Sequence, residues 1–257
     1  PSDLRAIYEA ASGRGERLPV SFVLGAHPID YVAATMRVPV DETELLASLR
    51  GAPLKLVKSI TNDILVPADA EMVIEGYLDE HGYVEDEGPF GEFAGYYGVM
   101  KKNPVFHLTA ITKRSDALFQ TATISGPYIG RTDTAVLNTL KSEAVVWRAL
   151  QTAIREPVAV NATGAGAGMF NLRISMRPRV PGEAQNAIAA AFGCLANVKN
   201  VFVVNDDIDI FDNDQMEWAL ATRFQPDRDL VVQGGMRTLP LDPSLYGARV
   251  GSKAGFD

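Results

Sequence analysis

The stretch Asp133-Thr-Ala-Val-Leu-Asn-Thr-Leu-Lys-Ser-Glu-Ala-Val-Val-Trp-Arg-Ala-Leu-Gln-Thr-Ala-Ile154 divides the chain into two parts of different character. Its apolar residues favour one face when they are placed on a 3.6-residue period, which predicts a long and partly buried helix. The residues before it are rich in short strand patterns, and the residues after it mix strands with helices. We therefore expect residues 133–155 to form a helix that connects two domains.

Six short segments before this helix are rich in branched or aromatic residues and are separated by turn residues, a pattern typical of antiparallel strands. These segments are residues 54–60, 64–66, 71–78, 96–99, 105–112 and 118–122. A helix over 4–12, a strand over 18–24 and helices near 29–35 and 45–49 are predicted ahead of them. Asp41 is a plausible N-cap, with Glu44 at the third helical position of a capping box. Residues 1–132 are thus predicted to hold an antiparallel barrel or sandwich.

The residues after the helix predict a smaller α/β or α+β domain over roughly residues 156–257. Its expected strands are 158–162, 171–176 and 198–205, and its expected helices are 182–192 and 216–223. The glycine-rich residues 162–168 could cradle a phosphate, but a flexible turn between strands is favoured, because the P-loop ending is absent. Asp206, Asp207 and Asp209 could bind a hard cation. Capping of the following helix, with Asp212 or Asn213 as the N-cap, is the better interpretation of these acids. The whole chain is therefore predicted to be an α+β protein.

Composition limits the classes of protein that this chain can represent. It has 257 residues, of which 47% are hydrophobic and 22% charged, and a net charge of −8. These values are typical of globular domains and disfavour a nucleic-acid partner. No apolar run approaches the roughly 18–20 residues that cross a bilayer, and residues 1–20 show no signal-peptide pattern. Cys194 cannot form an internal disulfide because it is the single cysteine, which favours the cytoplasm.

A second stretch, Glu87-Gly-Pro-Phe-Gly-Glu92, carries the strongest candidate for chemistry. Two glycines and a proline are expected to prevent a helix interior or a regular strand, with Pro89 pushing Gly88 toward an extended conformation. Two carboxylates held near an aromatic ring are typical of a general acid–base site. A tight acidic turn between two strands remains the alternative, because glycine and proline are frequent in turns.

Five motifs, in order along the chain, resemble those of the UbiD family of decarboxylases, which use prenylated FMN (prFMN). They are Gly25-x-x-Pro28, Glu44-Leu-Leu-Ala-Ser-Leu-Arg-Gly51, Val66-Pro-Ala-Asp-Ala-Glu-Met-Val-Ile-Glu-Gly76, the Glu87–Glu92 stretch with Gly95-Tyr96, and Asp206-Asp207-Ile208-Asp209 with Trp218-Ala219 and Thr222-Arg223. The resemblance implies a split β-barrel of the flavin-reductase type over residues 1–132 and a C-terminal oligomerisation domain over 156–257.

The resemblance also assigns roles to individual residues. Glu87 and Glu92 match the family's two catalytic glutamates, with Glu92 as the proton donor. Glu44 matches a ligand of Mn²⁺ or Mg²⁺, which a K⁺ ion commonly accompanies. Met36 and Lys199 match cofactor contacts, Lys199 at the flavin phosphate. The expected substrate pocket is formed by residues of the loops around the motif and before the long helix, namely Phe93, Ile124, Tyr128 and Arg131, although a surface charge is the favoured interpretation of Arg131.

The implied function is reversible, non-oxidative decarboxylation of an α,β-unsaturated, aromatic or heteroaromatic carboxylic acid. A separate flavin prenyltransferase would supply prFMN, and a homodimer or homohexamer is expected. The family's catalytic arginine, and the Asn and His that complete its metal site, match no residue at or after Pro1. We therefore expect this chain alone to bind prFMN poorly and to be inactive. A non-catalytic fragment, or a subunit that contributes the oligomerisation surface of a larger assembly, is the alternative function.

Overall fold

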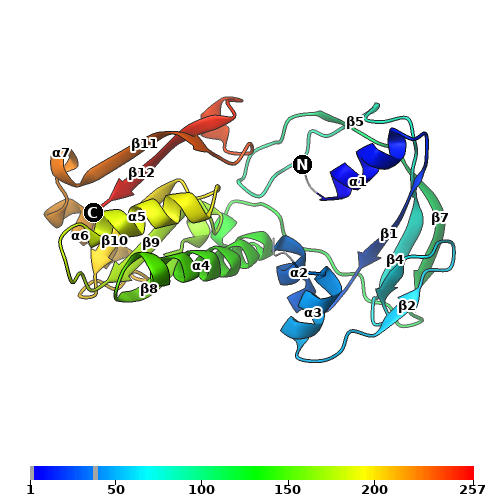
Figure 1. The fold of residues 1–257 in the computed structure, drawn as a ribbon, viewed down its shortest axis with the longest axis horizontal. Helices are drawn as coiled ribbons and strands as arrows, with labels where there is room; N and C mark the ends of the chain where they lie inside the picture. Colours follow the sequence, from blue (N-terminus) through cyan, green and yellow to red (C-terminus); the bar gives the residue numbers. More distant parts are fainter. Residues whose placement is uncertain (1–2, 37–39) are drawn as a thin grey trace. The chain divides into compact units, whose positions relative to one another are not determined.

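The computed structural model describes residues 3–36 and 40–257, which form two compact units. The N-terminal unit contains Pro1–Phe90 and Gly98–Thr121, and the C-terminal unit contains Gly91–Tyr97 and Ala122–Asp257. The two units are described separately below, and Figure 1 identifies their elements. The chain passes from one unit into the other within the Glu87–Glu92 stretch.

An antiparallel three-stranded sheet is the centre of the N-terminal unit. Strand β4 (Met72–Leu78) lies between β1 (Leu18–Leu24) and β7 (Phe106–Lys113). Gly76 is required at the register shift in β4, because a Cβ atom there would lie 2.1 Å from the carbonyl oxygen of His107.

Two hairpins complete the strands of this unit. One joins β2 (Leu56–Lys58) to β3 (Leu65–Pro67), and the other joins β5 (Glu85–Glu87) to β6 (Lys101–Asn103). The buried Glu75 carboxylate of β4 accepts hydrogen bonds from the backbone N–H groups of Ile60 and Thr61, at 3.0 and 2.7 Å, which ties the loop after β2 to the sheet.

Three helices accompany the sheet: α1 (Asp3–Ser12), α2 (Pro28–Thr35) and α3 (Glu42–Arg50). Tyr8 of α1 is buried, and its hydroxyl donates to the carbonyl oxygen of Asp79 at 2.9 Å. The N-cap prediction for α3 is confirmed, because the Asp41 carboxylate accepts from the Thr43 N–H at 2.8 Å. Gly51 ends α3 in the left-handed conformation, with φ of 66°.

The C-terminal unit is built on a five-stranded mixed sheet of order β11-β12-β10-β9-β8. Strand β10 runs parallel to both of its neighbours, whereas β8 and β11 are antiparallel to theirs. The strands are β8 (Pro157–Ala162), β9 (Asn171–Met176), β10 (Asn200–Asn205), β11 (Leu230–Arg237) and β12 (Val250–Phe256). The helices are α4 (Asp133–Ala153), α5 (Glu183–Cys194), α6 (Asn213–Arg223) and α7 (Pro226–Asp229), with 3₁₀ turns η1 (Ile129–Arg131), η2 (Gly164–Gly166) and η3 (Pro243–Leu245).

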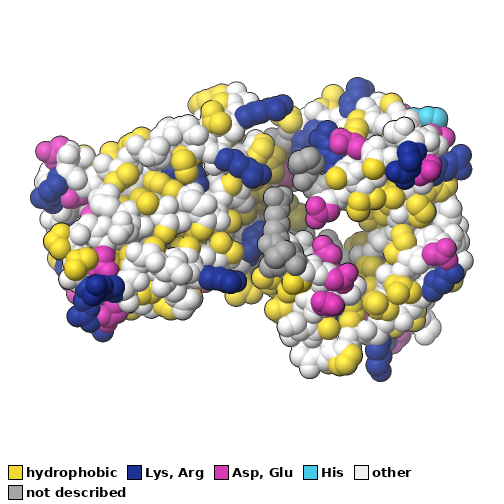
Figure 2. Space-filling view, viewed as in Figure 1, with side chains coloured by type: hydrophobic (Ala, Val, Ile, Leu, Met, Phe, Trp, Pro, Cys, Tyr) yellow, Lys and Arg dark blue, Asp and Glu magenta, His cyan; other side chains and the backbone are white. Residues whose placement is uncertain are grey.

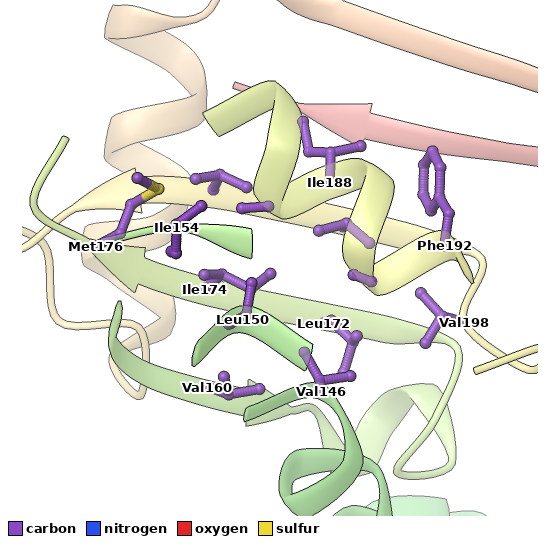
Figure 3. Close-up of a cluster of buried hydrophobic side chains, with 14 of the residues drawn as sticks. Val146, Leu150, Ile154, Val160, Leu172, Ile174, Met176, Ile188, Phe192 and Val198 are labelled. Carbon is purple, nitrogen blue, oxygen red and sulfur yellow. The ribbon is translucent and has the colours of Figure 1, made fainter. Parts of the chain in front are cut away.

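Helices cover both faces of this sheet. The main core packs α4 and α5 against one face, where Val146 and Leu150 of α4 are fully buried (Figure 3). Val201 of β10 belongs to this core, whereas its neighbour Phe202 packs against the second core formed with α6. The alternation follows from the two-residue period of a strand. Helix α4, which we expected to connect two domains, thus has its apolar face in the core of the C-terminal unit.

The structure confirms most of the elements predicted from the sequence, including the helix over 133–154, and the fold is mixed α/β. Two predicted strands are wrong: residues 96–99 and 118–122 form no strand. Strands β5, β6, β11 and β12 were not predicted. The glycine-rich turn is packed rather than flexible, because Ala167 is 2% exposed and Gly168 fits against α4, where a Cβ atom would lie 2.3 Å from the Ala135 carbonyl oxygen.

The surface carries charges of both signs. Figure 2 shows Lys, Arg, Asp and Glu side chains distributed over both units on the face in view, with hydrophobic side chains among them. Among residues 3–36 and 40–257, no helix has the length and apolar character needed to cross a membrane.

Candidate active site

The first glutamate of the Glu87–Glu92 stretch is the last residue of β5, so the motif begins inside a strand rather than outside regular structure. Its partner across the hairpin is Lys101, and its carboxylate accepts a hydrogen bond from the side-chain amide of Asn103. Gly88 has φ of 95°, which corrects the expected extended conformation, and the Gly88–Pro89 peptide bond is cis. Such a φ value strains residues other than glycine, which explains why glycine follows Glu87.

The second glutamate lies in a closed turn that belongs to the C-terminal unit. The Glu92 N–H donates to the carbonyl oxygen of Tyr96, and the Gly95 N–H donates to that of Glu92, both at 2.9 Å. Gly91 and Tyr97 pair as an isolated β-bridge. These bonds close the segment Gly91–Tyr97, hereafter the Glu92 loop, in which the Glu92 side chain is half-buried.

Two side-chain contacts attach the Glu92 loop to the rest of the C-terminal unit. The rings of Phe93 and Phe170 are stacked, with centroids 6.3 Å apart and planes 19° apart. Gly95, with φ of 84°, approaches Ile129 so closely that a Cβ atom would lie 2.7 Å from its Cδ1 atom. Two residues of the loop, Phe93 and Gly95, therefore contact residues elsewhere in the C-terminal unit. The aromatic residue between the two glutamates, Phe90, is 52% exposed and belongs to the N-terminal unit.

Lys199 is connected to the same part of the unit. Its backbone N–H donates to the carbonyl oxygen of Phe170 at 2.9 Å. Its ammonium group lies 2.9 Å from an Asp242 carboxylate oxygen and 2.5 Å from the Ser244 hydroxyl. Burial alone would raise the pKa of Asp242, but the hydrogen bonds from Lys199 and Ser244 outweigh it and hold the pKa below its usual value. The second Asp242 carboxylate oxygen lies 3.3 Å from the same nitrogen, so three oxygen atoms of the unit lie within hydrogen-bonding distance of the three N–H donors of Lys199.

The remaining pocket candidates lie before α4 in the C-terminal unit. Ile124 is 45% and Tyr128 69% exposed. Arg131 is exposed, and its guanidinium lies over the Tyr128 ring at 5.2 Å from the centroid. Its exposure agrees with the favoured interpretation of a surface charge. These residues are positioned by the start of α4, where the Thr132 hydroxyl caps the helix by accepting from the Ala135 N–H at 3.2 Å.

The metal and cofactor candidates Glu44 and Met36 are in the N-terminal unit. Glu44 is exposed in the first turn of α3, beside Glu42. Met36 follows α2 and precedes residues 37–39, which lie outside the described residues. Within the described part of the chain, no group of three or more His, Cys, Asp and Glu side chains is arranged to hold a metal ion.

A buried ion pair fixes α2 and α3 to each other. The Arg50 guanidinium at the end of α3 bonds to the buried Asp30 carboxylate of α2, and its Nη1 atom lies 2.7 Å from Asp69. The hydrogen bond to Asp30 is the main cause that raises the pKa of Arg50. Arg50 thus joins three segments, two of which carry the predicted ligands Glu44 and Met36.

The acids after β10 have structural partners. Asp206 pairs with Arg177, and Asp207 forms a two-pronged pair with Arg223 at 2.7 and 3.0 Å. The Asp209 carboxylate accepts from the Phe211 N–H at 2.9 Å. Asp212 is the N-cap of α6, as predicted. These contacts support the capping interpretation over a cation site.

A groove of about 320 Å³ lies elsewhere in the C-terminal unit, between α6 and the ends of β9, β10 and β12. Its walls include Met176, Phe202, Met216 and Phe256, and none of the candidate residues lines it. The groove is therefore separate from the Glu92 loop and Lys199.

Sequence reasoning missed three side chains that hold the candidate residues in place: Asn103, Phe170 and Asp242. None belongs to a motif with recognisable spacing. Phe170 follows the glycine-rich turn, and the available signal was the run of glycines, because glycine allows a close approach of backbone. An added Cβ atom on Gly130 would lie 3.0 Å from the carbonyl carbon of Gly164.

Two protein-family models match this chain. The 3-octaprenyl-4-hydroxybenzoate carboxy-lyase Rift-related domain of UbiD matches residues 2–128, and the C-terminal domain of the same carboxy-lyase matches residues 135–257. Among curated proteins, anhydromevalonate phosphate decarboxylase of Methanosarcina mazei is 34% identical over 260 residues. The match covers 100% of this chain and 59% of the relative, so the chain spans about three-fifths of that protein.

Solved structures agree with these matches. The UbiD-class enzyme HmfF from Pelotomaculum thermopropionicum in complex with FMN is 37% identical with a TM-score of 0.91, covering 100% of this chain and 57% of HmfF. An evolved dimeric form of HmfF in complex with prFMN is 35% identical with a TM-score of 0.86, at 100% and 56% coverage. Apo 3,4-dihydroxybenzoic acid decarboxylase (AroY) from Klebsiella pneumoniae is 30% identical with a TM-score of 0.89, at 100% and 56% coverage.

Proposed function

This chain belongs to the UbiD family of carboxy-lyases, and we propose that it provides the proton donor and part of the cofactor site of a prFMN-dependent decarboxylase. The reaction is the reversible, non-oxidative decarboxylation of a carboxylic acid, with Glu92 as the proton donor. The observation that supports this role best is the closed Glu92 loop, which holds one half-buried carboxyl by backbone bonds and by the Phe93–Phe170 and Gly95–Ile129 contacts.

The two glutamates have different surroundings, which suits different roles. Glu87 lies in a hairpin, and its carboxylate accepts a hydrogen bond from the side-chain amide of Asn103. Among the described residues, no hydrogen bond or ion pair involves the Glu92 carboxyl, which leaves its oxygens free to exchange a proton with a substrate carbon. A positioned carboxyl that protonates a carbon after CO₂ departs acts as a general acid.

The cofactor proposal is prFMN, supplied by a separate prenyltransferase. When bound, prFMN supplies the electron sink that decarboxylation requires and that no side chain provides. Lys199 suits a phosphate group, because its side chain carries a positive charge and is 33% exposed. Met36 offers an apolar contact to a flavin.

The metal proposal is Mn²⁺ or Mg²⁺ with Glu44 as one ligand, accompanied by K⁺. A carboxylate oxygen is the donor that these hard cations prefer, and the described residues form no hydrogen bond or ion pair with the Glu44 side chain that would compete. Among the described residues, Glu44 belongs to no group of three or more His, Cys, Asp and Glu side chains arranged to hold a metal ion, so the site would need additional ligands.

We propose an α,β-unsaturated, aromatic or heteroaromatic acid as the substrate. The names of two related proteins, anhydromevalonate phosphate decarboxylase and 3,4-dihydroxybenzoic acid decarboxylase, support a carboxylic acid substrate. Phe93, Ile124 and Tyr128 would line its pocket, and Arg131 would bind a second polar group on it. An acid that also carries a phosphate is the first substrate to test.

The test is Glu92→Gln in the complete protein that carries this chain, reconstituted with prFMN. Glutamine keeps the size and the loop bonds, which are all backbone bonds, but it cannot donate the proton. Turnover should fall at least about a hundredfold, the usual scale of general acid catalysis. The control is Glu85→Gln, which changes an exposed glutamate at the start of β5, and this variant should retain activity. Substantial decarboxylation by Glu92→Gln would remove Glu92 from the mechanism.

A second candidate function is a non-catalytic subunit that contributes an oligomerisation surface. The edge strand β11 favours it, because Val232 there is 63% and Leu230 39% exposed. This function predicts a stable dimer or larger assembly without flavin absorbance even when prFMN is supplied. An absorbance spectrum recorded during size-exclusion chromatography of the complete protein separates the two functions, since a decarboxylase supplied with prFMN should elute with the chromophore.

A further inference from the structure

Phe170 is the residue at which two predicted functional groups of the C-terminal unit meet. Its ring stacks on Phe93, the residue next to Glu92. Its carbonyl oxygen accepts from the backbone N–H groups of both Lys199 and Asn200, at 2.9 Å each. Phe170 therefore contacts the Glu92 loop through its side chain and the start of β10 through its backbone.

The position of Phe170 is itself fixed by the fold. It lies between the glycine-rich turn and β9, and its backbone N–H donates to the Gly166 carbonyl oxygen at 2.9 Å. The preceding Met169 is 3% exposed. An anchor built into packed backbone can hold a mobile partner in place, whereas a surface side chain cannot.

The Glu92 loop, by contrast, has few other restraints. Its neighbours in the loop, Tyr96 and Tyr97, are 61% and 80% exposed, and the segment contains no helix or regular strand. Two side-chain contacts with the rest of the unit add to the backbone bonds that close the loop: the Phe93–Phe170 stack and the Gly95–Ile129 contact. Loss of the stack should therefore loosen the loop while its backbone bonds remain.

We infer that Phe170 is a positioning residue for Glu92: its ring holds the loop so that the carboxyl keeps one place relative to the C-terminal unit. The inference deepens the proposed function, because positioning matters for catalysis only if Glu92 is the proton donor. The Phe170 ring would position Glu92 indirectly, through its stack on Phe93, and would not itself touch the reacting atoms. An offset aromatic stack of this geometry is a specific contact beyond area burial.

The first experiment needs no cofactor. Phe170→Leu removes the ring but keeps an apolar side chain and leaves the backbone bonds to Lys199 and Asn200 intact. Hydrogen–deuterium exchange of the amides in Gly91–Tyr97 should become roughly two- to tenfold faster, the factor that corresponds to one lost aromatic stack. Exchange in β9 and β10 should stay unchanged. Phe170→Tyr, which preserves the ring, should restore slow exchange.

Phe202→Leu is the matched control, because it removes an equally stacked ring of the same unit, 4.5 Å from Phe256, with no contact to the Glu92 loop. It should leave exchange in Gly91–Tyr97 unchanged. Unchanged exchange in Phe170→Leu, or an equal increase in Phe202→Leu, would overturn the inference.

The second experiment uses the complete protein loaded with prFMN. Phe170→Leu should lower kcat about tenfold or more, and this loss should exceed any rise in KM, because a displaced donor affects the chemical step, whereas Phe93 is only one wall of the proposed substrate pocket. Phe170→Tyr should recover most of the rate. If exchange responds as expected but Glu92→Gln remains active, the loop anchor stands and the proposed function fails. If exchange responds and Glu92→Gln is inactive but kcat of Phe170→Leu is unchanged, the positioning role is refuted.

Discussion

A buried lysine gives the C-terminal unit an unusual dependence of stability on pH. Lys253 of β12 is 1% exposed, and its ammonium group donates to the carbonyl oxygens of Phe192 and Leu195 at 3.0 Å each, at the end of α5. Burial lowers the pKa of Lys253 from 10.5 to about 8. The two carbonyl oxygens and the negative end of the helix dipole stabilise the charge that burial disfavours.

The sign follows from the two pKa values. Below about pH 8 both the folded and the unfolded chain carry the proton, and the fold bears the full cost of burying the charge. Between about 8 and 10.5 the folded lysine is neutral while the unfolded lysine is still charged, so stability rises with pH. With ~1.36 kcal/mol for each pKa unit, the difference between 10.5 and 8 corresponds to roughly 3 kcal/mol as an order of magnitude.

The perturbation that isolates this effect is Lys253→Met, which keeps the length of the side chain and removes the titrating group. Free energies of unfolding are measured in urea at several pH values from 7 to 10. The difference between wild type and variant should shift by about 2–3 kcal/mol in favour of wild type over that range. At pH 7 the variant also leaves two buried carbonyl oxygens without a donor, but that cost does not depend on pH.

Cys194 must be controlled, because it lies at the end of α5 and titrates in the same range. Burial raises the pKa of its thiol above 9.0, so the folded chain retains this proton longer and loses stability as pH rises. The effect is opposite in sign to that of Lys253. Both proteins are therefore also compared in a Cys194→Ser background. A difference between wild type and Lys253→Met that stays flat from pH 7 to 10 in this background would refute the reasoning.

Three further predictions concern stability, each measured by urea unfolding. Leu150→Ala should lower the free energy of unfolding by about 2–5 kcal/mol, because the side chain is fully buried, whereas Leu140→Ala on the exposed side of the same helix should cost less than about 1; equal costs would contradict the packing of α4. Glu75→Gln should cost about 1–3 kcal/mol, because the amide NH₂ group that replaces one carboxylate oxygen cannot accept from the N–H donor at that position, and a change below about 0.5 would contradict this. Asp212→Ala should cost about 1 kcal/mol by removing the cap of α6, and Asp214→Ala, which provides no cap, should cost less.

The sequence predicted those helices and strands whose apolar residues repeat with the helix or strand period and therefore form one buried face. The helix over 133–154 and strands such as 171–176 were identified because their apolar residues repeat with the period of the structure they form. The wrong strands have a physical explanation. Tyr96 and Tyr97 have high strand propensity, but they lie in a turn closed by the Gly95 and Glu92 N–H groups, and tertiary context overrides propensity there.

Strands β11 and β12 show the opposite error, because they are present in the structure but were not predicted from the sequence. Their segments contain Gly234, Gly235, Gly251 and Gly255, which lower strand propensity. Gly255 is nonetheless required, because a Cβ atom there would lie 2.4 Å from Ile188 of α5. The glycine that weakened the local signal is what allows the helix to approach the sheet, so only the three-dimensional packing explains the strand.

The candidate site shows why a motif does not define its own geometry. Glu87 and Glu92 are close in sequence, but Glu87 is held by a hairpin of the N-terminal unit and Glu92 by aromatic packing in the C-terminal unit. The motif therefore shows which residue types are present. The positions of the two carboxyls depend on Asn103, which contacts Glu87, and on Phe170, which packs against the residue next to Glu92. Since both of these residues are distant from the motif in sequence, substitutions at either position should alter a carboxyl without altering the motif. Each carboxyl is thus positioned by the unit to which it belongs, and the motif residues alone do not define that position.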